Sequence, residues 1–210
     1  REERELKAAF KKSELLQYKT SVVLVDGALT FSHLDSKTKN LREKFLGLYW
    51  EKLKLFYEKK QLVAAYTSLP RTRDLIKKFG SSKKLKLTDA DVLKNILKSP
   101  SQNAFYRTET FSVNNHIYFC YINVGTEIAR IEFPEWIAQN NDYVGLVCKV
   151  CCNQVQKGRG YPICLAEAHV QAVVTAAEQN FFYGYLQKMR GAKNSTHGSQ
   201  KMARKRSLFS

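Results

Sequence analysis

Acidic residues at the ends of predicted strands and helices are the first candidates for chemistry. Asp26 ends the apolar run 21–25 and is followed by Gly27. A carboxylate at the end of a buried strand is desolvated, so a divalent metal beside it would stabilise its charge. The alternative is an aspartate that only caps its own turn with Gly27.

Further acids lie at the ends of other predicted elements: Asp74, Asp89, Asp91, Glu127 and Glu167. Each of them alone could be a helix cap or a solvated side chain. Together they would supply oxygen ligands from several elements, as Mg²⁺ or Mn²⁺ requires, and would leave positions open for phosphate and water.

A tyrosine and a histidine form the second group of candidates. Tyr161 follows the glycine-containing loop 157–160, and His169 comes eight residues later, early in the last predicted helix. Histidine can bind a metal, carry a proton or contact phosphate, and a tyrosine hydroxyl can orient phosphate or water. A buried structural histidine among apolar neighbours is the alternative. The loop is not a P-loop, because it lacks the Gly-Lys-Ser/Thr ending.

The five cysteines contain one C-x-x-C pair, Cys148 and Cys151. A structural zinc site usually needs a second pair, whereas Cys120 and Cys164 are isolated in predicted strands. The pair also belongs to an apolar stripe at helical spacing, which favours burial as small hydrophobic residues. The odd number of cysteines is typical of a reducing compartment, so we expect a cytoplasmic protein. No GxSxG or HExxH motif is present, which argues against serine hydrolases and zincins.

The elements that must hold these residues alternate between strands and helices. Hydrophobic periodicity predicts helices over 1–19, 36–60, 72–76, 89–97, 143–156 and 167–189, and a further helix starting at Pro134. It predicts strands over 21–25, 62–66, 105–113, 116–124, 126–133 and 163–166, and a hairpin or bent continuation of the first strand at 28–31. The three strands between 105 and 133 form a predicted antiparallel meander. This order predicts an α/β fold with a mixed sheet.

The balance of charge points to a polyanionic partner. Lys and Arg number 35 against 19 acids, giving a formal net charge of +16 and a sequence pI of about 9.7. Residues 188–210 hold seven of the basic residues and no acid, so residues 1–187 keep a net +9. The segment 191–210 is expected to be a basic arm, either flexible or contributing a closing strand and phosphate contacts.

No segment of the sequence has the features of a signal peptide or a membrane span. The first residues are charged, and no apolar run approaches the roughly 18 residues that a transmembrane helix needs. The chain begins with Arg1 rather than Met, so we expect further sequence to precede it.

Several motifs, in order along the chain, resemble the NurA nuclease domain. They are Val25-Asp26-Gly27-Ala28-Leu29, the segments 66–75, 88–93, 117–121, 125–132 and 134–136, and the stretch from Lys157 through Glu167-Ala168-His169. The resemblance extends from about Val22 to Arg206. It implies an RNase H-like fold, a homodimer, a requirement for Mn²⁺ or Mg²⁺, and a partnership with the hexameric HerA translocase in 5′ to 3′ DNA end resection, a step of DNA repair.

The resemblance also implies roles for individual residues. Asp26 matches the metal ligand of the first strand, and Asp89 matches the acid of the Thr-Asp segment, with Asp91 as its alternate. Asp74 matches a second acid, unless Glu127 fills that role as a metal ligand. Tyr161 and His169 match a catalytic pair late in the domain. Basic side chains near these motifs and in the arm would hold DNA: Arg71, Arg73, Lys157, Arg159, Lys201, Arg204, Lys205 and Arg206.

These observations predict a metal-dependent nuclease domain over 1–190, which begins with a lead-in helix and is followed by the arm 191–210. Its substrate would be single- or double-stranded DNA. The alternative is a catalytically weak or inactive DNA-binding subunit of a HerA-type complex, because Ala28 stands where a hydroxyl residue is common in the family and 99–103 departs from the usual pattern. A third option, a basic scaffold, predicts no salt-dependent DNA affinity.

Overall fold

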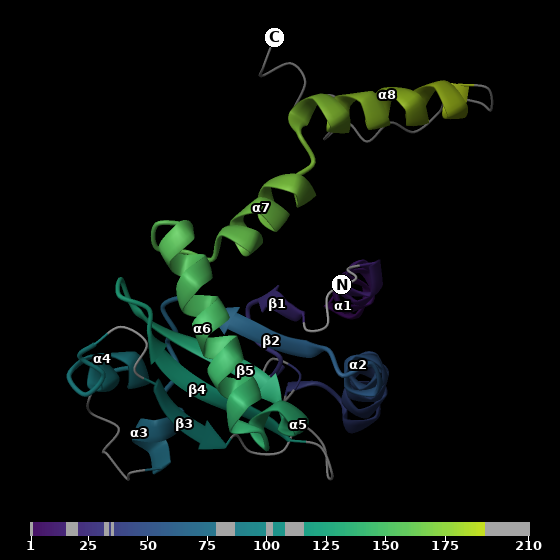
Figure 1. Cartoon of the computed structure of the whole chain (residues 1–210). Helices are drawn as coiled ribbons and strands as arrows, with labels where there is room; N and C mark the ends of the chain where they lie inside the picture. The colour runs from purple at the N-terminus through teal and green to yellow at the C-terminus, as the bar shows by residue number, and fades with distance from the viewer. Residues whose placement is uncertain are drawn as a thin grey trace. The chain divides into compact units, whose positions relative to one another are not determined.

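The computed structural model describes residues 2–15, 21–31, 34, 36–78, 87–99, 103–107 and 116–191 (Figure 1). The chain forms two compact units, Arg1–Ala168 and His169–Ser210. The basic residues Lys201, Arg204, Lys205 and Arg206 of the predicted arm lie outside the described residues.

The first unit is built on a five-stranded mixed sheet, as far as the structure is described. The strands are β1 (Val22–Asp26), β2 (Leu62–Thr67), β3 (Asn103–Arg107), β4 (Ile117–Asn123) and β5 (Ile128–Pro134), in the order β1-β2-β5-β4-β3. β1 and β2 are parallel, and the other neighbours are antiparallel. The predicted α/β class and mixed sheet are confirmed. The antiparallel meander is confirmed for its described residues, whereas 108–113 of its predicted first strand lie outside them.

Eight helices lie in the described part of the chain. They are α1 (Glu2–Leu15), α2 (Lys39–Glu58), α3 (Asp74–Lys78), α4 (Asp89–Lys94), α5 (Glu135–Ala138), α6 (Asn141–Lys157), α7 (Ile163–Ala172) and α8 (Ala176–Gly191). The first six agree with the predicted helices to within a few residues at their ends. Among the described helices, none is both long and apolar enough to cross a bilayer.

Side chains along each strand point alternately to the two faces of the sheet, so the core lies on both faces. Leu62, Ala64 and Tyr66 of β2 pack with α6, which crosses in front of the sheet in Figure 1. Val63 and Ala65 point to the opposite face and pack with α1 and α2. A separate cluster on α3 and α4 packs against β4 and the start of β5, and consists of Leu75, Leu93, Leu97, Phe119, Tyr121 and Ile128.

Three predicted elements are wrong. The segment 163–166 is not a strand but the first turn of α7, because Leu165 and Ala166 both donate backbone hydrogen bonds to the Pro162 carbonyl. The single helix predicted over 167–189 is interrupted at 173–175 and forms α7 and α8. The segment 28–31 forms no strand, since the amides of Leu29 and Thr30 donate to the Glu132 side chain instead of to a neighbouring strand.

Candidate active site at the carboxyl edge of the sheet

The topology brings Asp26 and Glu127 to the same edge of the sheet. β1 and β2 are parallel, so their carboxyl ends lie side by side, with Asp26 paired to Tyr66. β5 is antiparallel to β2, so the start of β5 lies beside the end of β2. Glu127 directly precedes β5 and therefore reaches this edge.

Asp26 is exposed, so the desolvation expected of a carboxylate at the end of a buried strand is not found, and its side chain is oriented by Tyr161. The Tyr161 hydroxyl donates to Asp26 Oδ1 at 2.9 Å, and no described residue donates to Oδ2. The following Gly27 has φ +102° and donates its amide to the Tyr66 carbonyl at 3.0 Å. Thr67 Oγ1 donates to the Gly27 carbonyl at 2.7 Å. A residue with a side chain rarely adopts such a φ, so the glycine allows the chain to turn directly after the carboxylate.

The glycines of the loop after α6 place Tyr161. Gly158 caps the C-terminus of α6, and a Cβ there would clash with the carbonyl oxygen of Tyr161. Gly160 has φ +124°, and its amide donates to the Val155 carbonyl at 3.0 Å. This compact turn directs the Tyr161 ring edgewise against Tyr66, with ring centroids 5.9 Å apart.

The two tyrosines at this edge are held in their neutral forms. Burial first, and then the hydrogen bond to Asp26, raise the pKa of Tyr161. Burial and the nearby Glu127 carboxylate raise the pKa of Tyr66 in the same way. Both hydroxyls are therefore proton donors to carboxylates at neutral pH.

Glu127 is half-buried and accepts three hydrogen bonds. Tyr66 donates to Oε1 at 2.9 Å, while the Ser68 hydroxyl and the Leu69 amide donate to Oε2 at 3.0 and 2.9 Å. The pair Tyr66 and Tyr161 thus connects Glu127 with Asp26 through two hydrogen bonds and one ring contact.

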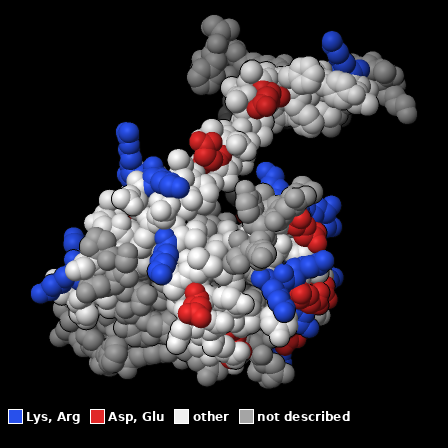
Figure 2. Space-filling model, in the orientation of Figure 1, with Lys and Arg blue, Asp and Glu red and all other residues white. Residues whose placement is uncertain are grey.

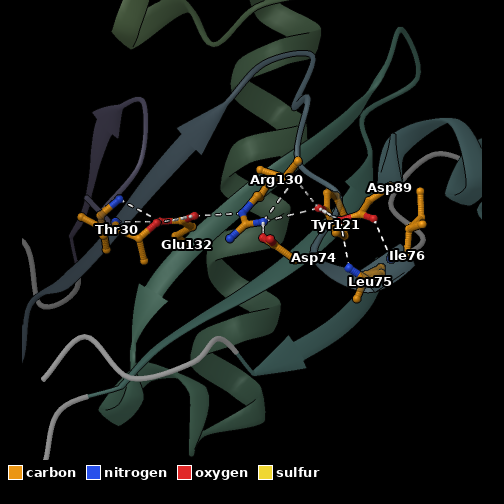
Figure 3. Close-up of polar contacts among 10 residues, drawn as sticks. Thr30, Asp74, Leu75, Ile76, Asp89, Tyr121, Arg130 and Glu132 are labelled. Carbon is orange, nitrogen blue, oxygen red and sulfur yellow. Dashed lines mark hydrogen bonds and ion pairs between the residues drawn. The ribbon is translucent and has the colours of Figure 1, made fainter. Parts of the chain in front are cut away.

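Asp89 and Asp91 have different surroundings. Asp89 is completely buried and accepts the Leu75 and Ile76 amides, both at 3.1 Å, and the Tyr121 hydroxyl at 2.9 Å. Its carboxylate therefore caps the start of α3 (Figure 3). Asp91 is exposed and forms a capping box with Thr88 at the start of α4.

Asp74 is paired with an arginine that sequence reasoning did not single out. Arg130 Nη1 lies 2.6 Å from Asp74 Oδ2, and Arg130 Nε lies 2.8 Å from Glu132 Oε1 (Figure 3). Arg130 and Glu132 are two residues apart in β5, whose other residues are all buried. Two charges at this spacing share one face of a strand. A pair of opposite charges within an otherwise apolar strand was therefore the sequence feature that could have identified Arg130 and Glu132.

The oxygen ligands at this edge fit a hard divalent cation. Asp26 offers an exposed carboxylate oxygen, and Glu127 adds a second carboxylate at the same edge. Among the described residues, no three His, Cys, Asp or Glu side chains gather as a metal site. Mg²⁺ is often held by one or two carboxylates, with waters and substrate phosphates completing its coordination, so two carboxylates suffice for this class of ion.

The other predicted site residues are distributed over several elements. Lys157 and Arg159 are exposed beside the Tyr161 loop, and Arg71 is exposed before α3, whereas Arg73 is half-buried. Figure 2 shows Lys and Arg on several parts of the visible face rather than in one patch. His169 begins the second unit and is exposed there, so it is not the buried core histidine that was the alternative.

The C-x-x-C pair lies in the core, as predicted. Cys148 and Cys151 are buried on the face of α6 that packs against the sheet, and Cys148 Sγ lies 3.8 Å from Cys120 Sγ. Burial raises the pKa of Cys151. All five cysteines are free thiols.

Comparisons with known proteins identify the family. A family model described as the NurA domain matches residues 1–174. The solved structure of the NurA nuclease from Sulfolobus solfataricus is similar to the chain with a TM-score of 0.57 and 16% sequence identity, over 94% of this chain and 67% of that chain. At this identity the likeness shows the fold. No curated protein matches the sequence. Because the family model covers most of its length, the chain belongs to the NurA family.

Proposed function

We propose that the protein is a metal-dependent DNA nuclease that hydrolyses phosphodiester bonds. The observation that carries this proposal is the exposed Asp26 carboxylate, fixed by Tyr161 at the same sheet edge as Glu127, in a chain of the NurA family. The structure of similar fold from Sulfolobus solfataricus is named a nuclease.

Asp26 and Glu127 are the residues that would hold Mn²⁺ or Mg²⁺. A divalent ion bound there would act as a Lewis acid on a phosphate oxygen and lower the pKa of a bound water. The Tyr161 and Tyr66 hydroxyls keep the two carboxylates oriented toward the edge. Asp74 and Asp89 remain proposed site residues, with Asp89 acting through the position of α3 and α4, since its side chain is completely buried whereas that of Glu127 is only half-buried.

The positive charge of the protein supports a nucleic acid substrate. The exposed Arg71, Lys157 and Arg159 would contact DNA phosphates, with Arg73 nearby in the chain. The family resemblance further supports a role for His169 in carrying a proton or contacting a phosphate. From the family resemblance we further propose a homodimer that resects DNA ends 5′ to 3′ with a HerA-type translocase in DNA repair.

A catalytically weak DNA-binding subunit is the second candidate function. It is favoured by the ion pair of Asp74 with Arg130 and by the three donors on the buried Asp89, since both acids then have other partners. Such a subunit would bind DNA and leave cleavage to an associated protein.

Cleavage and binding assays on the same DNA separate the two functions. Single- and double-stranded oligonucleotides labelled at either end would be incubated with the protein and Mn²⁺, Mg²⁺ or EDTA. A nuclease cuts with the metals and not with EDTA, and the labelled end shows its polarity. Salt-dependent binding without cutting under every condition would instead favour the inactive subunit.

A further inference from the structure

A charged pair in the middle of the sheet is almost completely buried. Arg130 is 4% exposed and Glu132 is 2% exposed. In the register of the sheet, Glu132 lies between Ala65 of β2 and Phe119 of β4. Ala65 belongs to the cluster under α1 and α2, and Phe119 belongs to the cluster under α3 and α4. The pair is therefore a polar contact that separates two apolar clusters on one face of the sheet.

On one side, the pair fixes the loop that follows Asp26. Glu132 Oε2 accepts the Leu29 amide at 2.8 Å and the Thr30 amide at 3.1 Å. The Thr30 hydroxyl lies 3.2 and 3.1 Å from the two carboxylate oxygens. Figure 3 shows Thr30 beside Glu132. Leu29 and Thr30 come three and four residues after Asp26, so Glu132 anchors the chain just beyond the candidate metal ligand.

On the other side, the pair fixes the start of α3. Arg130 Nη1 donates to Asp74 Oδ2 at 2.6 Å and to Thr72 Oγ1 at 3.3 Å. The guanidinium lies over the Phe119 ring, with Cζ 3.9 Å from its centroid, which limits its movement. Asp74 is the more open end of this chain of contacts, since its side chain is 39% exposed whereas that of Arg130 is 5% exposed.

Stability alone is a poor explanation for such a pair. Burying two charges costs solvation free energy, and the attraction between them often does no more than offset this cost. Replacing such a pair by apolar residues of similar size frequently leaves the protein equally stable. The Arg130 and Glu132 pair instead connects two backbone segments that carry acids of the candidate site. Side chains that orient metal ligands in this indirect way commonly change metal affinity or activity when they are replaced.

We propose that Arg130 and Glu132 are positioning residues of the nuclease centre, which hold the Asp26 turn and Asp74 in a fixed relation to each other. This inference rests on the proposed function. Arg130 is suited to the task because its planar fork contacts both carboxylates at once, whereas the single ammonium group of lysine is a point charge.

The test compares substitutions on both sides of the pair with matched surface controls. Glu132→Gln keeps the shape of the side chain but replaces the charged carboxylate beside Arg130 by a neutral amide. Arg130→Lys keeps the positive charge but removes the planar guanidinium group. Glu43→Gln and Arg42→Lys make the same changes at exposed positions of α2. For each variant, Mn²⁺ affinity is measured on the free protein by electron paramagnetic resonance, and kcat and KM are measured below the melting temperature.

We expect Glu132→Gln and Arg130→Lys to lower Mn²⁺ affinity or kcat by about 10–100-fold while KM for DNA stays within a few fold. The controls should match the wild type. Folded variants with wild-type Mn²⁺ affinity and kcat would overturn the inference while leaving the nuclease proposal intact. A wild-type protein that neither binds Mn²⁺ nor cuts DNA would instead overturn the proposed function, and the inference would fall with it.

A milder pair of variants decides the question if the buried substitutions prevent folding. Thr30→Val removes only the hydroxyl contact with Glu132 at a half-buried position, and Thr30→Ser keeps it. We expect Thr30→Val to lose several-fold in kcat or Mn²⁺ affinity and Thr30→Ser to retain both. Equal values for the two variants and the wild type would count against a positioning role.

Discussion

At the scale of single residues, the contact between Tyr161 and Asp26 determines how the carboxylate is presented. Tyr161→Phe removes the donor and leaves the ring contact with Tyr66 in place. We expect kcat to fall by about 10–100-fold with DNA affinity unchanged, because the hydroxyl donates to the candidate metal ligand Asp26. Tyr143→Phe, at an exposed position of α6, is the control. A Tyr161→Phe enzyme with wild-type kcat would contradict this role.

Tyrosines with raised pKa values also make the fold sensitive to high pH. Burial raises the pKa of Tyr121 to about 12, and the pKa values of Tyr66 and Tyr161 are raised too. Unfolded tyrosines ionise near pH 10, at about their ordinary pKa. The stabilisation from the neutral phenols is therefore complete below about pH 10 and is lost as the pH rises toward 12.

Melting temperatures between pH 8 and 12 test this expectation. The wild type should lose stability steeply above about pH 10, and Tyr121→Phe, although less stable at pH 8, should lose less over that range because one titrating phenol is gone. Parallel curves for the two proteins would show that Tyr121 does not contribute to the alkaline loss.

At the scale of elements, the sequence was informative where contacts are local. The apolar runs of β1 and β2 and the stripe of α6 follow from periodicity. The segment 163–166 was ambiguous, since a short apolar run suits a strand or a helix. The break before α8 is marked in the sequence by the Thr-x-x-Glu spacing of Thr175 and Glu178, which form a capping box at the start of that helix.

The capping box of α4 gives a prediction at this scale. The Thr88 hydroxyl accepts the Asp91 amide at 3.2 Å, and Asp91 Oδ2 accepts the Thr88 amide at 2.7 Å. Thr88→Ala should lower the free energy of unfolding by about 1 kcal/mol in urea titration, and Thr88→Ser should restore most of it. Because α4 begins with the buried Asp89, cleavage should weaken as well. Unchanged stability in Thr88→Ala would show that the box is not formed.

At the scale of the whole molecule, the polar contacts of the candidate site join residues far apart in the chain. Tyr161 and Asp26 are separated by 135 residues, and Leu29 and Glu132 by 103. Local patterns predicted that Asp26 was important but carried no information on these partners. The spacing of Arg130 and Glu132 places them on one face of β5, but only the register of β5 with β2 and β4 shows that they lie between two clusters.

The net charge of +16 gives a prediction for DNA binding as a whole. On duplex DNA, log K should fall linearly with log salt, with a slope of about 0.9 per neutralised phosphate. Replacing Lys157 and Arg159 by glutamine should reduce the slope by about 2 if each contacts one phosphate. The control replaces Lys11 and Lys54, exposed residues of α1 and α2. Equal slopes for both double variants would place DNA elsewhere.

The most direct test of the central claim compares Asp26→Asn with Asp142→Asn, which makes the same change at an exposed position of α6. Initial rates of Mn²⁺-dependent cleavage are measured on one labelled DNA, and binding of the same DNA is measured in EDTA. We predict that Asp26→Asn loses at least ~100-fold in rate while binding DNA normally, and that Asp142→Asn cuts at the wild-type rate. Cleavage by Asp26→Asn at the wild-type rate would contradict the assignment of this edge of the sheet as the active site.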